Sequence, residues 1–263
     1  MSTQNDIAKA FKALHKPGNP IILTNVWDAI TAKTVASLPA TKALATASYA
    51  IAAAAGTPDE ELTLEVNLRA VEAIAKIAKQ FDLPLTVDFQ DGFGDQLEEG
   101  LRAVIKLGAV GINLEDLSRE SNRLYSIEEA QERIRRVMKI AEEEGVPDFV
   151  VNARTDALFT SPSNDLDEAI ARGKAYLAAG ASNIFIWGGP SRKGWGKAGI
   201  EEATKVLKGR LNVILVRMAP GGLSVKELGE IGVSRISVGP QLMIRTSGAV
   251  AEEANAILEG QSI

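Results

Sequence analysis

Residues 85–116 read LTVDFQDGFGDQLEEGLRAVIKLGAVGINLED, and this stretch decides the fold class. Leu85–Phe89 and Val110–Leu114 are short apolar, β-branched runs, which are typical of buried strands. Between them, Leu97 to Leu107 carries apolar residues at helical spacing, and Gly108 follows where the end of a helix favours glycine. A strand, a helix and a second strand in this order predict a right-handed βαβ unit with parallel strands.

The same alternation continues in both directions from this unit. The eight predicted strands are Ile21–Asn25, Lys42–Thr46, Leu85–Phe89, Val110–Leu114, Phe149–Ala153, Asn183–Trp187, Val213–Val216 and Arg235–Val238. Other predicted helices run from Val66 to Ile77, from Ile127 to Ala141 and from Leu166 to Ala179. Eight such units predict a single α/β domain, residues 1–263, folded as a (β/α)8 barrel of the TIM type. A doubly wound open sheet is the alternative, but no G-x-G-x-x-G follows the first strand.

Composition narrows the class of protein. The chain has 263 residues, of which 46% are hydrophobic and 24% charged, with a net charge of −5. It has no cysteine, which excludes disulfides, thiolate zinc sites and a cysteine nucleophile. We find no signal peptide, no run of about 18 apolar residues and no basic patch, so we expect a cytoplasmic protein that binds neither membrane nor nucleic acid.

Charged side chains gather where the predicted strands end, which is where TIM barrels place their active sites. These residues are Asp28, Asp88, Glu115, Asp116, Arg154 and Asp156. Buried carboxylates that lie close together repel each other unless a cation is bound, and oxygen ligands suit Mg2+, with Mn2+ as an alternative. Some of the carboxylates, Asp28 and Asp156 above all, could instead cap the helices that follow.

The strand ends resemble those of the isocitrate lyase/phosphoenolpyruvate mutase superfamily. The matching motifs are N-V-W-D-A at Asn25–Ala29, Ser48-Tyr49-Ala50, G-T-P-D at Gly56–Asp59, V-D-F-Q-D-G-F-G at Val87–Gly94, N-L-E-D at Asn113–Asp116 and N-A-R-T-D at Asn152–Asp156. Their order and spacing, each at a strand end, carry the resemblance. It implies Mg2+-dependent chemistry beside the oxo group of a 2-oxo acid, through an enolate.

The resemblance also implies a metal site. Asp88 matches the direct ligand, and Asp59 and Glu115 match carboxylates that act through water. Gln90 stands where the family usually has a second aspartate. A neutral amide offers an oxygen there but weakens the field at the cation.

For the substrate, the resemblance implies that Arg154 clamps a carboxylate, although a salt bridge to a neighbouring carboxylate is the alternative. The segment of Ser48, Tyr49 and Ala50 would hold the substrate, above a floor of Trp27 and Asp28. Trp187 would supply an apolar wall. Tyr49 is the candidate proton donor, and Glu115 and Asn122 are further candidate catalytic residues.

Departures from the family pattern narrow the reaction. Isocitrate and methylisocitrate lyases of the family carry a cysteine acid after strand four, and Leu117–Leu124 has none. Phosphonate-forming mutases usually have lysine after the E-D pair, where this chain has Leu117. The resemblance therefore favours a lyase or decarboxylase that cleaves a C–C bond in a small 2-oxo or 2-hydroxy dicarboxylate. A P–C bond mutase or hydrolase and a non-catalytic, carboxylate-binding barrel stay open.

Three features lie outside these motifs. His15, the only histidine, precedes the first strand, and we expect it at the surface. The glycine-rich loop from Gly188 to Gly194 could hold a phosphate or be a plain loop. The amphipathic tail Val250–Leu258 could pack on another subunit, as in the tetramers common in the family, so we expect a homo-oligomer, either a dimer or a tetramer.

Overall fold

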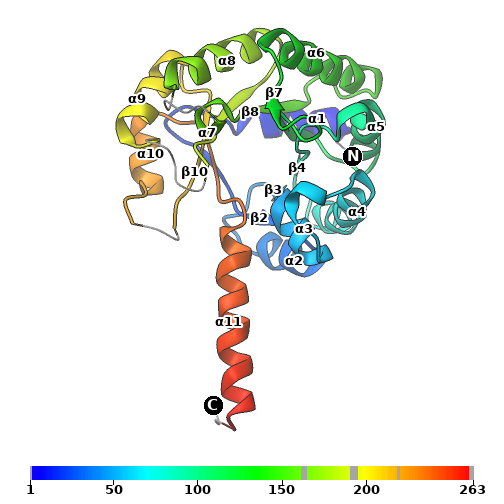
Figure 1. Cartoon of the computed structure of the whole chain (residues 1–263). Coiled ribbons are helices and arrows are strands. Elements are labelled where there is room, and N and C mark those ends of the chain that lie inside the picture. Colours follow the sequence, from blue (N-terminus) through cyan, green and yellow to red (C-terminus); the bar gives the residue numbers. More distant parts are fainter. Residues whose placement is uncertain (1, 161–164, 190–194, 218–219, 261–263) are drawn as a thin grey trace.

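The computed structural model describes residues 2–160, 165–189, 195–217 and 220–260, and its main feature is a parallel sheet that curls into a barrel (Figure 1). Around the barrel the strands follow the order β1-β11-β10-β9-β8-β5-β4-β3-β2. Their bounds are β1 Ile21–Leu23, β2 Asn25–Val26, β3 Leu44–Thr46, β4 Leu85–Asp88, β5 Gly111–Glu115, β8 Val150–Thr155, β9 Asn183–Ile186, β10 Leu211–Ile214 and β11 Arg235–Ser237. Each neighbouring pair is parallel, as the βαβ prediction requires.

The first predicted strand closes the barrel. It is interrupted at Thr24, so that β1 pairs with β11 while β2 pairs with β3. One continuous segment thereby contacts both ends of the sheet. The nine strands occupy the eight predicted positions, and the prediction of a TIM-type barrel is confirmed.

Most of the helices form a ring outside the sheet, whereas α1 covers its amino-terminal end and α11 projects from the barrel (Figure 1). Their bounds are α1 Gln4–Ala13, α2 Ala29–Ala36, α3 Ser48–Ala55, α4 Leu64–Gln80, α5 Leu97–Lys106, α6 Ile127–Glu143, α7 Ala157–Thr160, α8 Leu166–Ala178, α9 Lys197–Val206, α10 Val225–Ile231 and α11 Gln241–Leu258, with 3-10 turns at Asp59–Glu61 and Gly94–Gln96. Local signals set the ends of α6 and α5. Ser126 and Glu129 form a capping box before α6, and Gly108 ends the turn after α5 with a φ of 102°.

Helix α1 covers the amino ends of the strands. Gln4 Nε2 donates to the carbonyl oxygens of Ile105, in the last turn of α5, and of Ala109, just before β5, at 2.8 and 2.9 Å. Phe11 is fully buried beneath β5, where a Cβ on Gly111 would lie 2.7 Å from the carbonyl oxygen of Val150. A larger residue at 111 would push the strands apart. With this end closed, the opposite end is the one open to a ligand.

The structure corrects the bounds of one predicted strand and adds a short strand pair that the sequence did not predict. The seventh strand is Leu211–Ile214, two residues earlier than predicted, because Leu211 and Asn212 already pair with β9. The loop after β5 contains an antiparallel pair, β6 (Leu117–Ser118) and β7 (Arg123–Leu124), which is too short to leave a sequence pattern. Residues 190–194 of the predicted glycine-rich loop lie outside the described part of the chain.

His15 is not the surface residue that we expected. Its ring is half-buried and packs edge-on against Phe11, with 4.9 Å between ring centroids. Its Nδ1 lies 2.9 Å from the Phe11 carbonyl oxygen and its Nε2 3.5 Å from Nη1 of Arg235. Burial, together with the positive charge of Arg235, lowers the pKa of His15 to about 3.

Helix α11 projects away from the barrel (Figure 1), and none of its residues is buried. Val250 and Leu258 are 68% and 86% exposed, which is unusual for apolar side chains on one helix. None of the described helices is long and apolar enough to cross a membrane. The homo-oligomer expected from the tail stays a prediction, and an exposed α11 is the surface that it would cover.

We predict that His15 makes the protein less stable in acid. Below a pH of about 6.5 the histidine of the unfolded chain takes up a proton, and the folded form does not until about pH 3. The free energy of unfolding should therefore fall as the pH drops through this window, by up to about 1.4 kcal/mol per pH unit. His15→Gln keeps a polar side chain but cannot titrate. The free energies of unfolding of the wild type and of His15→Gln, measured by urea unfolding at pH 7, 6 and 5, should converge toward pH 5. A difference that stays constant over these pH values would contradict the assignment.

Candidate active site

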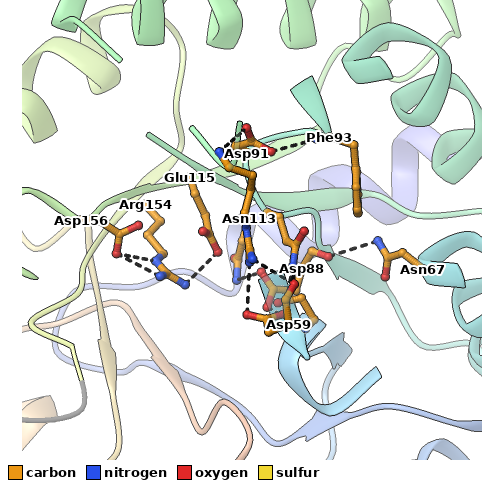
Figure 2. A network of polar contacts seen from close by, with 12 residues as sticks. Asp59, Asn67, Asp88, Asp91, Phe93, Asn113, Glu115, Arg154 and Asp156 are labelled. Atoms are coloured by element: carbon orange, nitrogen blue, oxygen red, sulfur yellow. Dashed lines mark hydrogen bonds and ion pairs between the residues drawn. The ribbon is translucent and has the colours of Figure 1, made fainter. Parts of the chain in front are cut away.

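A network of charged side chains occupies the carboxyl ends of β4, β5 and β8 (Figure 2). Asp88 is the last residue of β4 and Glu115 the last of β5. Arg154 lies directly across from Glu115 in the register between β5 and β8. Three neighbouring strands thus bring together residues that are far apart in the sequence, as the strand-end argument predicted.

Arg154 is held from two sides. Its Nη1 donates to Glu115 Oε1 at 2.8 Å, and its Nε and Nη2 donate to Asp156 Oδ1 at 3.0 and 2.9 Å. The ring of Trp187 lies 4.2 Å from the guanidinium carbon, close enough for a cation–π contact. The salt bridge that we considered as an alternative role is therefore present. It fixes the guanidinium at the barrel opening.

Glu115 and Asp156 are buried carboxylic acids with shifted pKa values. Burial is the main cause for both: it raises the pKa of Glu115 to about 8 and that of Asp156 to about 6. The charge of Arg154 opposes both shifts but does not cancel them. The two carboxyl groups flank one arginine, so they compete for a single counterion.

Asp88 has few direct partners. Its Oδ2 accepts a hydrogen bond from the backbone N–H of Ser48 at 2.9 Å, and its own N–H donates to Thr46 Oγ1 at 2.8 Å. Burial raises the pKa of Asp88, while the N–H of Ser48 and the charge of Arg154 lower it. The Asp88 carboxylate is thus held by the N–H of Ser48, and no Lys or Arg in the described part of the chain forms an ion pair with it.

Asp59, by contrast, is fully engaged. Gln90 Nε2 donates to its Oδ1 at 2.9 Å, and Arg119 Nη2 donates to its Oδ2 at 3.1 Å. Gln90 has a φ of 49°, which ends the strand and turns its amide toward Asp59. Where the resemblance implies two acidic groups, this chain has an amide donor and an arginine that both bind Asp59.

These residues fit Mg2+ only in an open arrangement. Among the described residues, no three His, Asp or Glu side chains come together as a closed metal site. Mg2+ typically binds through one or two carboxylates and keeps several waters. Asp88, the least neutralised carboxylate of the network, fits the direct ligand, with Glu115 nearby in the same network.

The other predicted residues have varied positions. Asp28 caps α2 through a capping box with Thr31, which was our alternative interpretation of this residue. Trp27 packs against Ile51 and Ala52. Ala50 is buried in α3, and Tyr49 on the same helix is 49% exposed. Asn122 lies exposed between β6 and β7, and the described contacts do not join it to the charged network.

Part of the site could not be predicted from the sequence. Asp156 has two interpretations in the sequence, a strand-end carboxylate and a helix cap; in the structure it directly follows β8 and binds Arg154. The pairing of Arg119 with Asp59 left no signal, because the two residues are 60 positions apart. Asp116 faces away from the opening and accepts hydrogen bonds from Tyr176 Oη at 2.7 Å and from the N–H of Asp156 at 2.9 Å.

We predict that Asp116 stabilises the wall behind Arg154. Asp116→Ala removes the acceptor of the buried Tyr176 and an ion-pair partner of the buried Arg172, whose Nη1 lies 3.3 Å from Asp116 Oδ2. The free energy of unfolding should fall by about 3 kcal/mol or more, measured by urea unfolding. Glu132→Ala, which breaks an exposed pair with Arg135, should change it by less than about 1 kcal/mol. Equal losses in both variants would contradict the prediction.

Known proteins are similar to this chain in sequence and in architecture. The family model of phosphoenolpyruvate phosphomutase matches residues 11–258. The 2-methylisocitrate lyase of Escherichia coli K12 is 33% identical over 189 residues, which is 67% of this chain and 60% of that enzyme.

Two solved structures are also similar. A protein of Burkholderia cenocepacia J2315, provisionally named a phosphonomutase, is 34% identical with a TM-score of 0.84 over 98% of this chain and 100% of its own. A phosphonopyruvate hydrolase solved with oxalate and Mg2+ shares the fold, at 24% identity and a TM-score of 0.81 over 97% and 88% of the two chains. With a family match that spans nearly the whole barrel, this chain belongs to the phosphoenolpyruvate phosphomutase family.

Proposed function

We propose that this chain is a Mg2+-dependent lyase or decarboxylase that cleaves the C–C bond next to the oxo group of a small 2-oxo or 2-hydroxy dicarboxylate. One observation carries the proposal: a fixed guanidinium, Arg154, and Asp88, a carboxylate that pairs with no cation of the described residues, share one charged network at the barrel opening (Figure 2). The first suits a substrate carboxylate and the second a divalent cation.

Arg154 binds the carboxylate in this proposal. Its contact with Glu115 uses one nitrogen, whereas Asp156 occupies Nε and Nη2. A substrate carboxylate that displaces Glu115 would gain the Nη1 donor while Asp156 continues to orient the guanidinium. Since the pKa of Glu115 is raised to about 8, the released carboxyl group can hold a proton near neutral pH.

Asp88 holds the cation, with Glu115 and Asp59 acting through water. Bound Mg2+ would polarise the oxo group as a Lewis acid. Arg154 then stabilises the negative charge that develops as the bond breaks, because a preorganised cation needs no rearrangement. The N–H of Ser48 keeps Asp88 in place. Tyr49 and Asn122 stay candidates for proton transfer and for closure of the loop.

The aromatic wall supports a substrate that is not polar throughout. Trp187 packs on Arg154 and on Phe159, with 4.8 Å between the two ring centroids, and Phe185 lies 5.7 Å from the guanidinium. An alkyl substituent beside the bound carboxylate would contact these rings and remove apolar surface from water.

P–C bond chemistry is the second candidate, which the provisional name of the Burkholderia structure favours. A phosphonate brings a dianion that needs a cation of its own. In the loop after β5, Arg119 already pairs with Asp59, and Arg123 is exposed. This loop therefore supports a C–C substrate more than a phosphonate.

The test is pyruvate release from oxaloacetate, methylated oxaloacetates, 2-methylisocitrate, 2,3-dimethylmalate and phosphonopyruvate, with Mg2+ or with EDTA. We expect Mg2+-dependent turnover of a C–C substrate that is lost in Asp88→Ala. Arg154→Lys should lower kcat/KM by at least about tenfold, since lysine lacks the planar fork. Asp148→Ala, which changes the amino-terminal end of the barrel near Asn5, is the matched control and should keep activity. Turnover of phosphonopyruvate alone would favour the mutase or hydrolase. Metal binding without turnover would favour a non-catalytic barrel.

A further inference from the structure

Four polar side chains stand side by side inside the barrel, one on each of four neighbouring strands. Asp88 of β4 pairs in register with Asn113 of β5, Asn113 with Asn152 of β8, and Asn152 with Asn183 of β9. The three asparagines are buried, and Asn152 and Asn183 are fully inaccessible. Buried amides of this kind need hydrogen-bond partners, and here they find one another.

The hydrogen bonds of this amide ladder (Ser234, Asn183, Asn152 and Asn113) all run in one direction. Ser234 Oγ donates to Asn183 Oδ1 at 2.7 Å, Asn183 Nδ2 to Asn152 Oδ1 at 3.2 Å, and Asn152 Nδ2 to Asn113 Oδ1 at 2.8 Å. The last donor, Asn113 Nδ2, faces Asp88 Oδ1 at 3.5 Å (Figure 2). Hydrogen bonds that point the same way polarise one another, so the ladder directs its donor end at the Asp88 carboxylate.

Arg235 fixes this direction. It is the first residue of β11, is 1% exposed, and donates from Nη2 to Asn113 Oδ1 at 3.0 Å. No carboxylate of the described residues lies within ion-pair distance of it. A guanidinium can only donate, so a flipped Asn113 would turn its NH2 group against another donor. Asn113 must present its oxygen to Arg235 and its NH2 group to Asp88.

We propose that Arg235 is a positioning residue for the metal site: it locks the amide of Asn113 so that the ladder donates to Asp88 and holds this carboxylate ready for a divalent cation. The metal part rests on the proposed function, whereas the locked amide does not. His15 supports the arrangement from below. Its Nδ1 faces a carbonyl oxygen and must donate, which leaves Nε2 as the acceptor that faces Arg235 Nη1.

The experiment uses the full chain and two readouts. In metal-free protein, the side-chain NH2 signals of Asn113 and Asn152 are followed by NMR. Separately, the dissociation constant of Mn2+ is measured by titration. Arg235→Met removes the donor, and should shift the Asn113 NH2 signals and weaken Mn2+ binding by about 10- to 100-fold, as loss of a group that orients a metal ligand typically does. Arg235→Lys keeps a side chain that can only donate hydrogen bonds, so this variant should retain most of the affinity for Mn2+.

Asn212→Ala is the matched control. Asn212 is equally buried on β10 but donates to Ser237 Oγ, outside the ladder, so its loss should leave Mn2+ binding unchanged. If Arg235→Met does not fold, Asn152→Ala takes its place and should weaken Mn2+ binding where Asn212→Ala does not. Unchanged Asn113 signals in Arg235→Met, or equal losses of affinity in Asn212→Ala, would overturn the proposal. If Arg235→Met shifts the Asn113 NH2 signals but the wild-type protein binds no Mn2+, the metal assignment is refuted and the locked amide stands.

Discussion

The site depends on one electrostatic constraint, which is that several carboxylates and few cations are buried together at the carboxyl ends of neighbouring strands. Glu115 and Asp156 share Arg154. Burial raises the pKa values of both acids, and one guanidinium does not neutralise two carboxylates, so it does not cancel these shifts. Asp88 has no ion pair at all among the described contacts. The parallel barrel imposes this crowding, since it brings all strand ends to one opening. In the proposed function, a divalent cation would pair with Asp88, and an anionic substrate would take the place of Glu115 at Arg154.

Two cations in the structure occupy positions that the motifs do not describe. Arg119 compensates Asp59 from the loop after β5, so this loop is fastened to the turn at Asp59–Glu61. Arg235 contributes its charge from inside the barrel, and the charge of Asp88 partly offsets the lowering of its pKa by burial. Gln90 stands where the family usually has an aspartate, and this difference goes together with the pairing of Arg119 and Asp59. The amide of Gln90 donates to Asp59 and makes that carboxylate part of the loop attachment, which would leave Asp88 as the principal anionic ligand of the proposed cation site.

Periodic patterns predicted the barrel well, because the alternation of apolar strands with amphipathic helices repeats along the chain and does not depend on any single contact. The strand-end position of Asp88, Glu115 and Arg154 followed from the same pattern. The split of the first strand at Thr24 and the contact of His15 with Arg235 did not, because each depends on residues far apart in the sequence. The β6–β7 pair is local, but it is too short to leave a sequence pattern. Arg235 had a weak signal, since a charged residue within an apolar strand is rare. Its bond to Asn113 spans 122 positions and could not be inferred from one sequence.

The most direct test of the account is a crystal structure of the protein with Mn2+ and oxalate, in which anomalous scattering locates the metal. The account predicts one peak at about 2.1 Å from a carboxylate oxygen of Asp88, with oxalate against Nη1 of Arg154 and Glu115 displaced from that nitrogen. A peak between Glu115 and Asp156, or an Arg154 that keeps both carboxylates while oxalate binds elsewhere, would contradict it.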